Sequence, residues 1–350
     1  MKVYIETIDS PKGEITVYRL VNAGGASVTL SSVGAGIVGI EVPDGEGRLA
    51  DVALGYKNPA DYFHDGPCAG KVPGRYANRI ARGELTVDGK NYQLAINNGP
   101  NALHGGPEGF QNHIWDCEMV GSDTVVFSLF SPDGDEHYPG NLTARVAYTW
   151  SDECILKIEL SATTDATTVV NLTNHAYFNL AGENAGSVLD HELQLKATRY
   201  LPTDDTLIPS GEMADVAGTP MDFTALKKLG QDIKADFPAL NYGKGYDNCW
   251  VLDDEPTADG LRLAATLIDS GSRRKLDVLT DQPAVQVYTG NWLSGSPESK
   301  SGRSYNDYDG VAIECQGMPD APHHDNFPSQ LLTPDGEYRR VIFFAFSTID

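Results

Sequence analysis

Glu314 is the residue whose surroundings most directly suggest chemistry. It lies in Val311–Cys315 (VAIEC), a run that is otherwise apolar and resembles a buried strand. A buried carboxylate is costly unless it is paired or hydrogen-bonded, and burial raises its pKa toward neutrality. A carboxylate with such a pKa can act as a general base near pH 7. A structural ion pair, or a Glu on the solvent face of a half-buried strand, would give the same pattern.

Two histidines lie among polar residues that could exchange protons or bind hydroxyl groups. His175 lies in Asn171–Asn179 (NLTNHAYFN), and imidazole can exchange a proton near pH 7. His104 lies in Asn101–Gly106 (NALHGG), where two glycines would let a ligand approach the backbone, or would simply form a turn. For His175, a structural role held by a neighbouring carbonyl group fits equally well.

Three further segments carry polar side chains of the kind that bind sugars. Gln286 interrupts the apolar run Ala284–Tyr288, where its amide could bind a hydroxyl group or be satisfied within the core. Asp247 lies among aromatic residues, and a carboxylate next to rings is typical of sites for hydroxyl-rich ligands. Arg79, like the nearby Arg75, is a rigid multiple donor, with a surface ion pair as the alternative.

The hydrophobic pattern around these residues repeats every two positions, which predicts strands. Leu142–Trp150 alternates apolar and polar residues, and the alternation resumes over Leu156–Leu160, which predicts a hairpin with one buried face. Glu84–Leu94 predicts a second hairpin that turns at Asp88-Gly89. Further strands are expected at Ile15–Leu20, Ser27–Ile40, Thr124–Ser131, Val169–Thr173, Glu192–Ala197, Leu261–Ile268, Ala284–Tyr288, Val311–Cys315 and Arg340–Phe346.

Few windows fit a helix, and the best, Phe223–Leu229 and Leu226–Ile233, are short. Many strands separated by Gly, Pro, Asp and Asn, without alternating helices, predict an all-β fold, a large antiparallel β-sandwich. Because no linker, composition shift or internal repeat divides the chain, we predict a single domain over residues 1–350, whose long loops carry function.

The composition excludes several classes of protein. The net charge of −23 argues against nucleic acid, which needs clustered Lys and Arg, and against an anionic membrane surface. No apolar run approaches the roughly 20 residues of a spanning helix, and Met1–Ser10 has no signal-peptide core, so we expect a cytoplasmic protein. The 5 cysteines, without a CxxC pair, are expected to be reduced thiols.

Motifs for a cofactor or a metal are lacking in the sequence. It contains no GxSxG, HExxH or P-loop, and no GxGxxG before a helix. His323-His324-Asp325 could suggest a metal, but adjacent side chains on a strand point to opposite faces, so we expect no metal ion there.

Eight segments, taken together and in their order, resemble the aldose 1-epimerase (galactose mutarotase) family. They are GRYANRI (74–80), NALHGG (101–106), SPDGDEHYPG (131–140), TNHAYFNL (173–180), GYDNCW (245–250), YTGNW (288–292), AIECQGMPDAP (312–322) and TPDGEYRR (333–340). The match is thinner over the first 40 residues and over 185–240. The resemblance implies a galactose mutarotase-like supersandwich, and an isomerase that interconverts the α and β anomers of free aldohexoses such as galactose and glucose.

The resemblance also implies roles for single residues. Glu314 would be the general base and His175 the general acid. Sugar binding would fall to Asn78, Arg79, His104, Asp247 and Gln286. Ring opening and reclosure need one base and one acid and no redox step, so no cofactor is implied. The expected partner is a free hexose, and the chain is expected to be a monomer or a weak homodimer.

Three departures from the family pattern leave the preferred hexose open. Asn248 follows Asp247 where the family often has His, and Gly317-Met318 stands where a bulkier residue is common. Next to His137, in the loop DGDEHYPG, the family more often has Gly.

Three other functions fit part of the pattern. A hexose-6-phosphate epimerase of the same fold would need a basic cluster, for which Arg75 and Arg79 are the candidates. A carbohydrate-binding module tends to lose the acid or the base, whereas Glu314 and His175 are both present. A glycoside hydrolase needs two carboxylates flanking the bond, and Glu314 with Asp247 could supply them, but His175 favours epimerisation.

Overall fold

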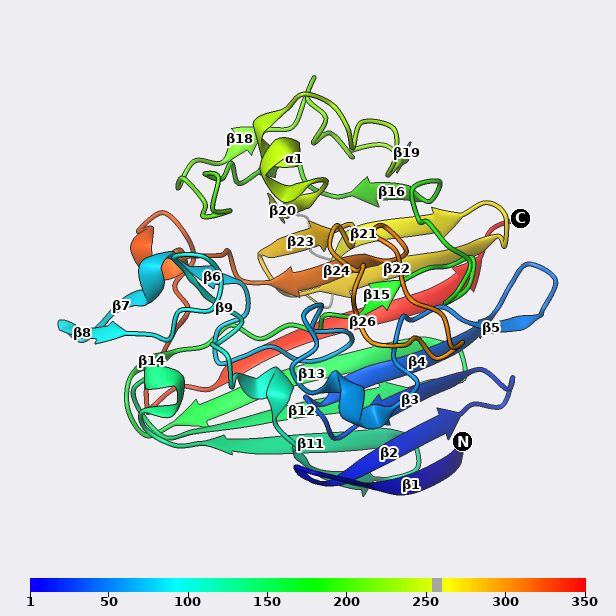
Figure 1. The fold of residues 1–350 in the computed structure, drawn as a ribbon, viewed down its shortest axis with the longest axis horizontal. Coiled ribbons are helices and arrows are strands. Elements are labelled where there is room, and N and C mark those ends of the chain that lie inside the picture. The colour runs from blue at the N-terminus through cyan, green and yellow to red at the C-terminus, as the bar shows by residue number, and fades with distance from the viewer. Residues whose placement is uncertain (254–259) are drawn as a thin grey trace.

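The computed structural model describes residues 1–253 and 260–350, and antiparallel strands form most of its regular structure (Figure 1). The N-terminal sheet has the order β1-β2-β3-β4-β5. Its strands are β1 (Lys2–Ser10), β2 (Gly13–Val21), β3 (Ser27–Ser31), β4 (Gly36–Pro43) and β5 (Leu49–Asp51).

The largest sheet has nine strands in the order β10-β11-β12-β13-β26-β22-β21-β16-β19. These are β10 (Asp116–Val120), β11 (Thr124–Ser131), β12 (Leu142–Trp150), β13 (Ile155–Thr164), β26 (Tyr338–Thr348), β22 (Arg274–Thr280), β21 (Arg262–Asp269), β16 (Glu192–Leu195) and β19 (Lys227–Lys228). The last strand of the chain therefore lies in the middle of this sheet, as its red ribbon in Figure 1 makes visible.

A six-stranded sheet carries several of the candidate residues, in the order β15-β24-β23-β20-β17-β18. Its strands are β15 (Tyr177–Phe178), β24 (Val311–Gln316), β23 (Ala284–Tyr288), β20 (Asp247–Val251), β17 (Arg199–Tyr200) and β18 (Ala214–Asp215). Three short pairs complete the strands: β6 (Arg79–Ile80) with β9 (Ala102–Leu103), β7 (Glu84–Val87) with β8 (Lys90–Gln93), and β14 (Thr168–Val169) with β25 (Leu331–Leu332). The one α-helix of the described residues is α1 (Pro238–Gly243), and 3-10 turns lie at Pro59–Tyr62, Ala81–Gly83, Phe110–Asn112, Asp135–His137 and Ala321–His323.

One apolar core joins the three large sheets. Tyr18 of β2 packs edge-on against Phe127 of β11, with ring centroids 6.4 Å apart. Phe178 of β15 packs against Phe344 of β26 at 5.0 Å. The same buried cluster also holds Trp250 of β20 and residues of the other strands. The nine-stranded sheet is thus covered by the two other sheets, which confirms the predicted all-β sandwich, and from this shared core we infer a single domain over residues 1–350.

Three details of the predicted elements are wrong. Neither Phe223–Leu229 nor Leu226–Ile233 is helical, because Phe223 is buried against Trp250 with ring centroids 6.0 Å apart, and Lys227–Lys228 pair with β16 as a strand. The strand predicted over Val169–Thr173 ends at Val169. The run Ser27–Ile40 is two strands, since the chain turns after Ser31 through Gly34 and Ala35, both with positive φ. The hairpin predicted over Glu84–Leu94 is confirmed as β7 and β8.

Candidate active site

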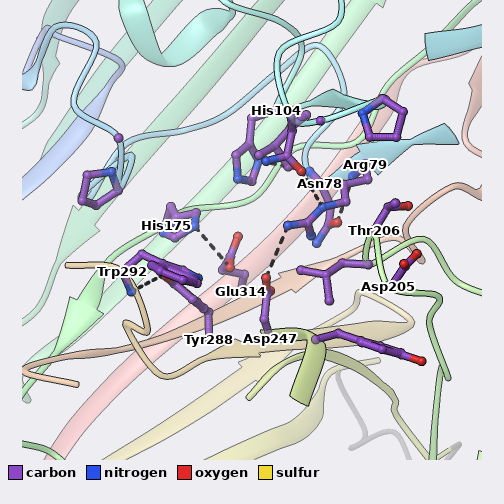
Figure 2. Close-up of a pocket in the computed structure, with 18 of the residues that line it drawn as sticks. Asn78, Arg79, His104, His175, Asp205, Thr206, Asp247, Tyr288, Trp292 and Glu314 are labelled. Carbon is purple, nitrogen blue, oxygen red and sulfur yellow. Dashed lines mark hydrogen bonds and ion pairs between the residues drawn. The ribbon is translucent and has the colours of Figure 1, made fainter. Parts of the chain in front are cut away.

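A cavity of about 410 Å³ opens beside the six-stranded sheet, where the sheet meets the chain around β6 and β9. Figure 2 shows that side chains from distant parts of the sequence point into it. The sequence predicted six of its lining residues: Asn78, Arg79, His104, His175, Asp247 and Glu314. The volume suits a ligand the size of one sugar ring with its solvation.

Strand register explains why three of the polar side chains share one face of the sheet. Gln286 of β23 lies directly opposite Glu314 of β24 on one side and Cys249 of β20 on the other. Asp247 lies two residues before Cys249, so its side chain points to the same face. Asn248 points to the opposite face and is buried there.

Glu314 and His175, the two titratable residues that the sequence analysis singled out for acid–base chemistry, lie next to each other in the cavity. Glu314 Oε1 lies 3.4 Å from His175 Nε2, and the two residues are 2% and 5% exposed. Burial raises the pKa of Glu314 well above its usual range, as does the charge of Asp247, while Arg79 opposes the rise. Burial lowers the pKa of His175 to about 4. The low-dielectric cavity therefore disfavours charge on both groups and favours one shared proton on Glu314.

His104 faces His175 across the cavity, with ring centroids 5.4 Å apart. Its Nδ1 accepts a hydrogen bond from the backbone N–H of Asn78 at 3.1 Å, which assigns the remaining ring proton to Nε2. Burial, then the neighbouring His175 and Arg79, lowers the pKa of His104 well below its usual value. His104 is therefore a neutral imidazole that can donate one hydrogen bond from Nε2.

A second polar cluster is built around Asp247. Its Oδ1 accepts a hydrogen bond from Gln286 Nε2 at 2.6 Å, and its Oδ2 lies 3.3 Å from Arg79 Nη2. Arg79 Nε in turn donates to Asn98 Oδ1 at 3.1 Å. These contacts fix a carboxylate and a guanidinium side by side, which suits a pair of adjacent hydroxyl groups because one accepts and the other donates.

Gln286 and Arg75 are placed differently from the other candidates. Gln286 is not among the residues that line the cavity, and its amide donates to Asp247; its part in sugar binding stays a prediction. Arg75 is buried away from the cavity and donates to Ser131 and to the carbonyls of Pro132, Pro139 and Gly140. The departures at Asn248, Gly317, Met318 and His137 also lie outside the cavity lining.

The tandem histidines are not on a strand, contrary to the argument made from sequence. They lie at the end of a 3-10 turn, and both face one carboxylate: His323 Nδ1 lies 2.6 Å from Asp320 Oδ1, and His324 Nε2 lies 3.4 Å from Asp320 Oδ2. Within residues 1–253 and 260–350, no group of three His, Cys, Asp or Glu side chains is arranged to hold a metal ion.

Sequence reasoning missed several residues that line the cavity. Tyr177 and Tyr288 pack beside His175, with ring centroids at 5.0 and 6.4 Å. Asn98 and Asp205–Leu207 also line the cavity, and Figure 2 shows Asp205 and Thr206 on the same side of it as Arg79. The tyrosines could have been suspected from their motifs, whereas only tertiary packing brings the Asp205–Leu207 loop to the site.

The fold and the site together define an all-β enzyme that moves protons on a ligand rich in hydroxyl groups. The sequence profile of the aldose 1-epimerase family matches residues 16–344. The chain is 42% identical over 340 residues to galactose mutarotase from Bos taurus, covering 97% of this chain and 96% of that protein. It is 38% identical over 334 residues to aldose 1-epimerase from Escherichia coli K12, covering 94% and 95%.

Solved structures agree with these relatives. An aldose epimerase homologue from C. elegans superposes with a TM-score of 0.87 at 30% identity, covering 99% of this chain and 100% of that one. Galactose 1-epimerase from Lactobacillus acidophilus gives 0.87 at 28% identity over the whole of both chains. The chain belongs to the aldose 1-epimerase family. It is an isomerase, and its reaction is the interconversion of the anomers of aldoses.

Proposed function

We propose that Glu314 is the general base and His175 the general acid in the mutarotation of free aldohexoses such as galactose and glucose. The observation that carries this proposal is the 3.4 Å separation of two buried, titratable side chains at a cavity of sugar size. The neighbouring Asp247, Arg79 and His104 supply the hydrogen-bonding groups that a hydroxyl-rich ring needs.

Each proton transfer has one donor and one acceptor. Glu314 removes the proton of the anomeric hydroxyl, the carbonyl forms, and the bond from the anomeric carbon to the ring oxygen breaks. The ring oxygen takes its proton from His175. After rotation about the bond between the first two carbons, the 5-hydroxyl returns its proton to His175 and attacks the other face of the aldehyde, whose oxygen recovers the proton from Glu314.

Sugar binding must also move the shared proton from Glu314 to His175. In the empty cavity, burial favours the neutral form of both groups. A sugar hydroxyl that donates to Glu314 and a ring oxygen that accepts from His175 both favour the ionised forms. The substrate therefore creates the charged pair that its own reaction requires, at a position where Arg79 also stabilises the carboxylate.

Binding and orientation would fall to the remaining polar groups. Asp247 and Arg79 are placed for adjacent hydroxyls, and Gln286 supports Asp247. His104 can donate from Nε2 to an oxygen on which charge develops. Asn78 lines the cavity, and because its side-chain oxygen accepts from the N–H of Arg79, its amide N–H groups would be the part that binds the sugar.

The alternative function, a hexose-6-phosphate epimerase, would need Arg75 and Arg79 to bind the phosphate group. Arg75 is engaged with carbonyls elsewhere, and Arg79 is paired with a carboxylate. We therefore expect turnover of galactose and glucose to exceed that of glucose 6-phosphate by at least about tenfold in kcat/KM, because a dianion would lie close to Asp247 and Glu314. Equal or faster turnover of the phosphate ester would contradict the free-sugar assignment.

Gln286→Leu tests the support of Asp247. Losing a hydrogen bond to a charged group costs about 1.5–3 kcal/mol, so we expect KM for galactose to rise roughly tenfold or more with a smaller change in kcat. Initial rates over a range of galactose concentrations measure both constants. A KM for galactose within threefold of the wild-type value in Gln286→Leu would argue against a role for Gln286 in holding Asp247.

Chelation tests the expectation that no metal takes part. Activity on galactose should be unchanged after prolonged dialysis against EDTA. Loss of activity that one particular divalent ion restores would overturn this expectation.

The cellular compartment and the oligomeric state of the enzyme are also proposals. No helix among the described residues is long and apolar enough to cross a membrane. All 5 cysteines are free thiols, which fits a reducing compartment, and we infer a cytoplasmic enzyme that is a monomer or a weak homodimer. Sedimentation at micromolar concentration would test the oligomeric state.

A further inference from the structure

Lys71 is a fully buried lysine next to the backbone of His175, and the reaction described above does not use it. Its side chain and that of Asp65 both have zero exposure, and they form an ion pair. Lys71 Nζ also donates to the carbonyl of Tyr62 and to Asn112 Oδ1. Asp65 Oδ2 accepts from the hydroxyl of Tyr56 at 2.9 Å and from the N–H of Ala69 at 2.8 Å. The segment from Asp65 to Lys71 is thus fixed at both ends.

This segment holds the backbone of His175 from both sides. The N–H of His175 donates to the carbonyl of Lys71, and the N–H of Gly70 donates to the carbonyl of His175, each at 2.9 Å. Gly70 has φ +73°, and a Cβ there would lie 1.8 Å from the carbonyl oxygen of Ile37, so the close approach requires glycine. Asn174 Nδ2 adds a hydrogen bond to the carbonyl of Gly70 at 2.8 Å.

The imidazole of His175 has little else to orient it. Among the described residues, its buried Nδ1 has no hydrogen-bond partner, and its Nε2 faces Glu314. A catalytic histidine is usually oriented by a hydrogen bond to its second nitrogen. In this protein the imidazole is oriented by the two backbone hydrogen bonds of His175 and by the rings of Tyr177 and Tyr288.

We propose that the buried Lys71–Asp65 ion pair is a positioning device for His175, which fixes the backbone of the general acid and adds a buried positive charge to its surroundings. This inference rests on the proposed role of His175. A buried ion pair contributes little net stability compared with an apolar pair of similar size, so stability alone does not account for it.

The charges of Lys71 and Asp65 determine whether the pKa of His175 should rise or fall when either residue is replaced. Burial is the main cause of the lowered pKa of His175; the Lys71 ammonium lowers it further, while the charge of Asp247 opposes the shift. Asp65 offsets part of that charge because it lies against the ammonium. The other titratable groups around His175 are Glu314, Asp247, Arg79, His104, Tyr177 and Tyr288, with Cys68 in the segment that holds its backbone. Neither variant replaces any of these groups, so the sign of a shift reports the charge that was removed from the pair.

Two neutral variants of the full-length protein should therefore shift the pH dependence in opposite directions. Lys71→Gln removes the positive charge, so the pKa of His175 should rise and the limb of the kcat/KM profile for galactose that belongs to His175 should move up by about half to one pH unit. Asp65→Asn leaves the ammonium unbalanced, so the same limb should move down. We expect kcat at the optimum to fall about tenfold in each variant, with KM within threefold, because the acid is less well positioned. Lys71→Arg, which keeps the charge, should leave the profile in place.

Opposite shifts cannot come from a loss of packing alone, which would lower activity without moving the limbs. If either Lys71→Gln or Asp65→Asn does not fold, the pH profile of the remaining variant still tests whether its shift has the predicted sign. Profiles that coincide with the wild type in the folded variants would overturn the proposal. If the wild-type protein does not turn over galactose, the proposed function fails instead, and NMR titration of His175 then tests the inference by itself: its midpoint must be higher in Lys71→Gln than in the wild type.

Discussion

Glu314→Gln is expected to lower kcat for galactose mutarotation by about 10³-fold, within the range for loss of a positioned general base. The amide has almost the same shape as the carboxylate but cannot take the anomeric proton. Because Asp247, Arg79 and His104 remain, the sugar should still bind, with a dissociation constant within about fivefold of the wild-type value. Initial rates from polarimetry measure kcat, and calorimetric titration with galactose measures the dissociation constant.

The control for this variant lies on the same strand. Cys315→Ala changes a buried residue of β24 whose side chain points away from the cavity, so it perturbs the strand without touching the site. It should keep at least half of the wild-type rate. If Glu314→Gln turned over galactose nearly as fast as Cys315→Ala, Glu314 would not be the base.

His175→Asn should lower kcat by about 10²-fold or more, because the departing ring oxygen loses its proton donor. The limb of the pH profile that belongs to the imidazole should disappear as well. The buried pair then has one titrating member, Glu314, whose pKa burial keeps high. Rates between pH 5 and 9 would be compared with those of the wild-type protein.

Tyr177→Phe is the matched control for His175→Asn. It keeps the ring that packs on His175 and removes only a hydroxyl that donates to the carbonyl of Pro67 at 2.9 Å. We expect its rate to stay within threefold of wild type. A His175→Asn variant that retained both limbs of the profile would move the acid role to another group, with His104 as the next candidate.

Polar residues in apolar runs indicated several of the side chains that the fold brings to the cavity, while their proposed roles in catalysis came from the resemblance to a family. Glu314 and Gln286 each interrupt a strand, and antiparallel register then brings them opposite each other. The pattern could not distinguish a residue that lines the cavity from one that supports it, because both are polar and buried. Gln286 is the example, since its contact with Asp247 depends on how β20 pairs with β23.

Other parts of the molecule were not predictable from the sequence alone. Lys71 lies in a short segment of small residues and looks like a surface charge, and only the folded chain buries it against Asp65. Phe223 and Leu229 have helical spacing, but both are core residues of an irregular segment that packs on the sheets. In each case a contact with a distant part of the chain overrides the local preference.

Mutarotation by an acid–base pair is most directly tested by polarimetry on freshly dissolved α-D-galactose. The optical rotation drifts toward equilibrium without a catalyst, and the purified wild-type protein should increase the rate in proportion to its concentration without changing the final rotation. The Glu314→Gln protein at the same concentration should leave the drift close to that of buffer. A drift that the wild-type protein does not accelerate with either galactose or glucose, or one that both proteins accelerate equally, would contradict the account.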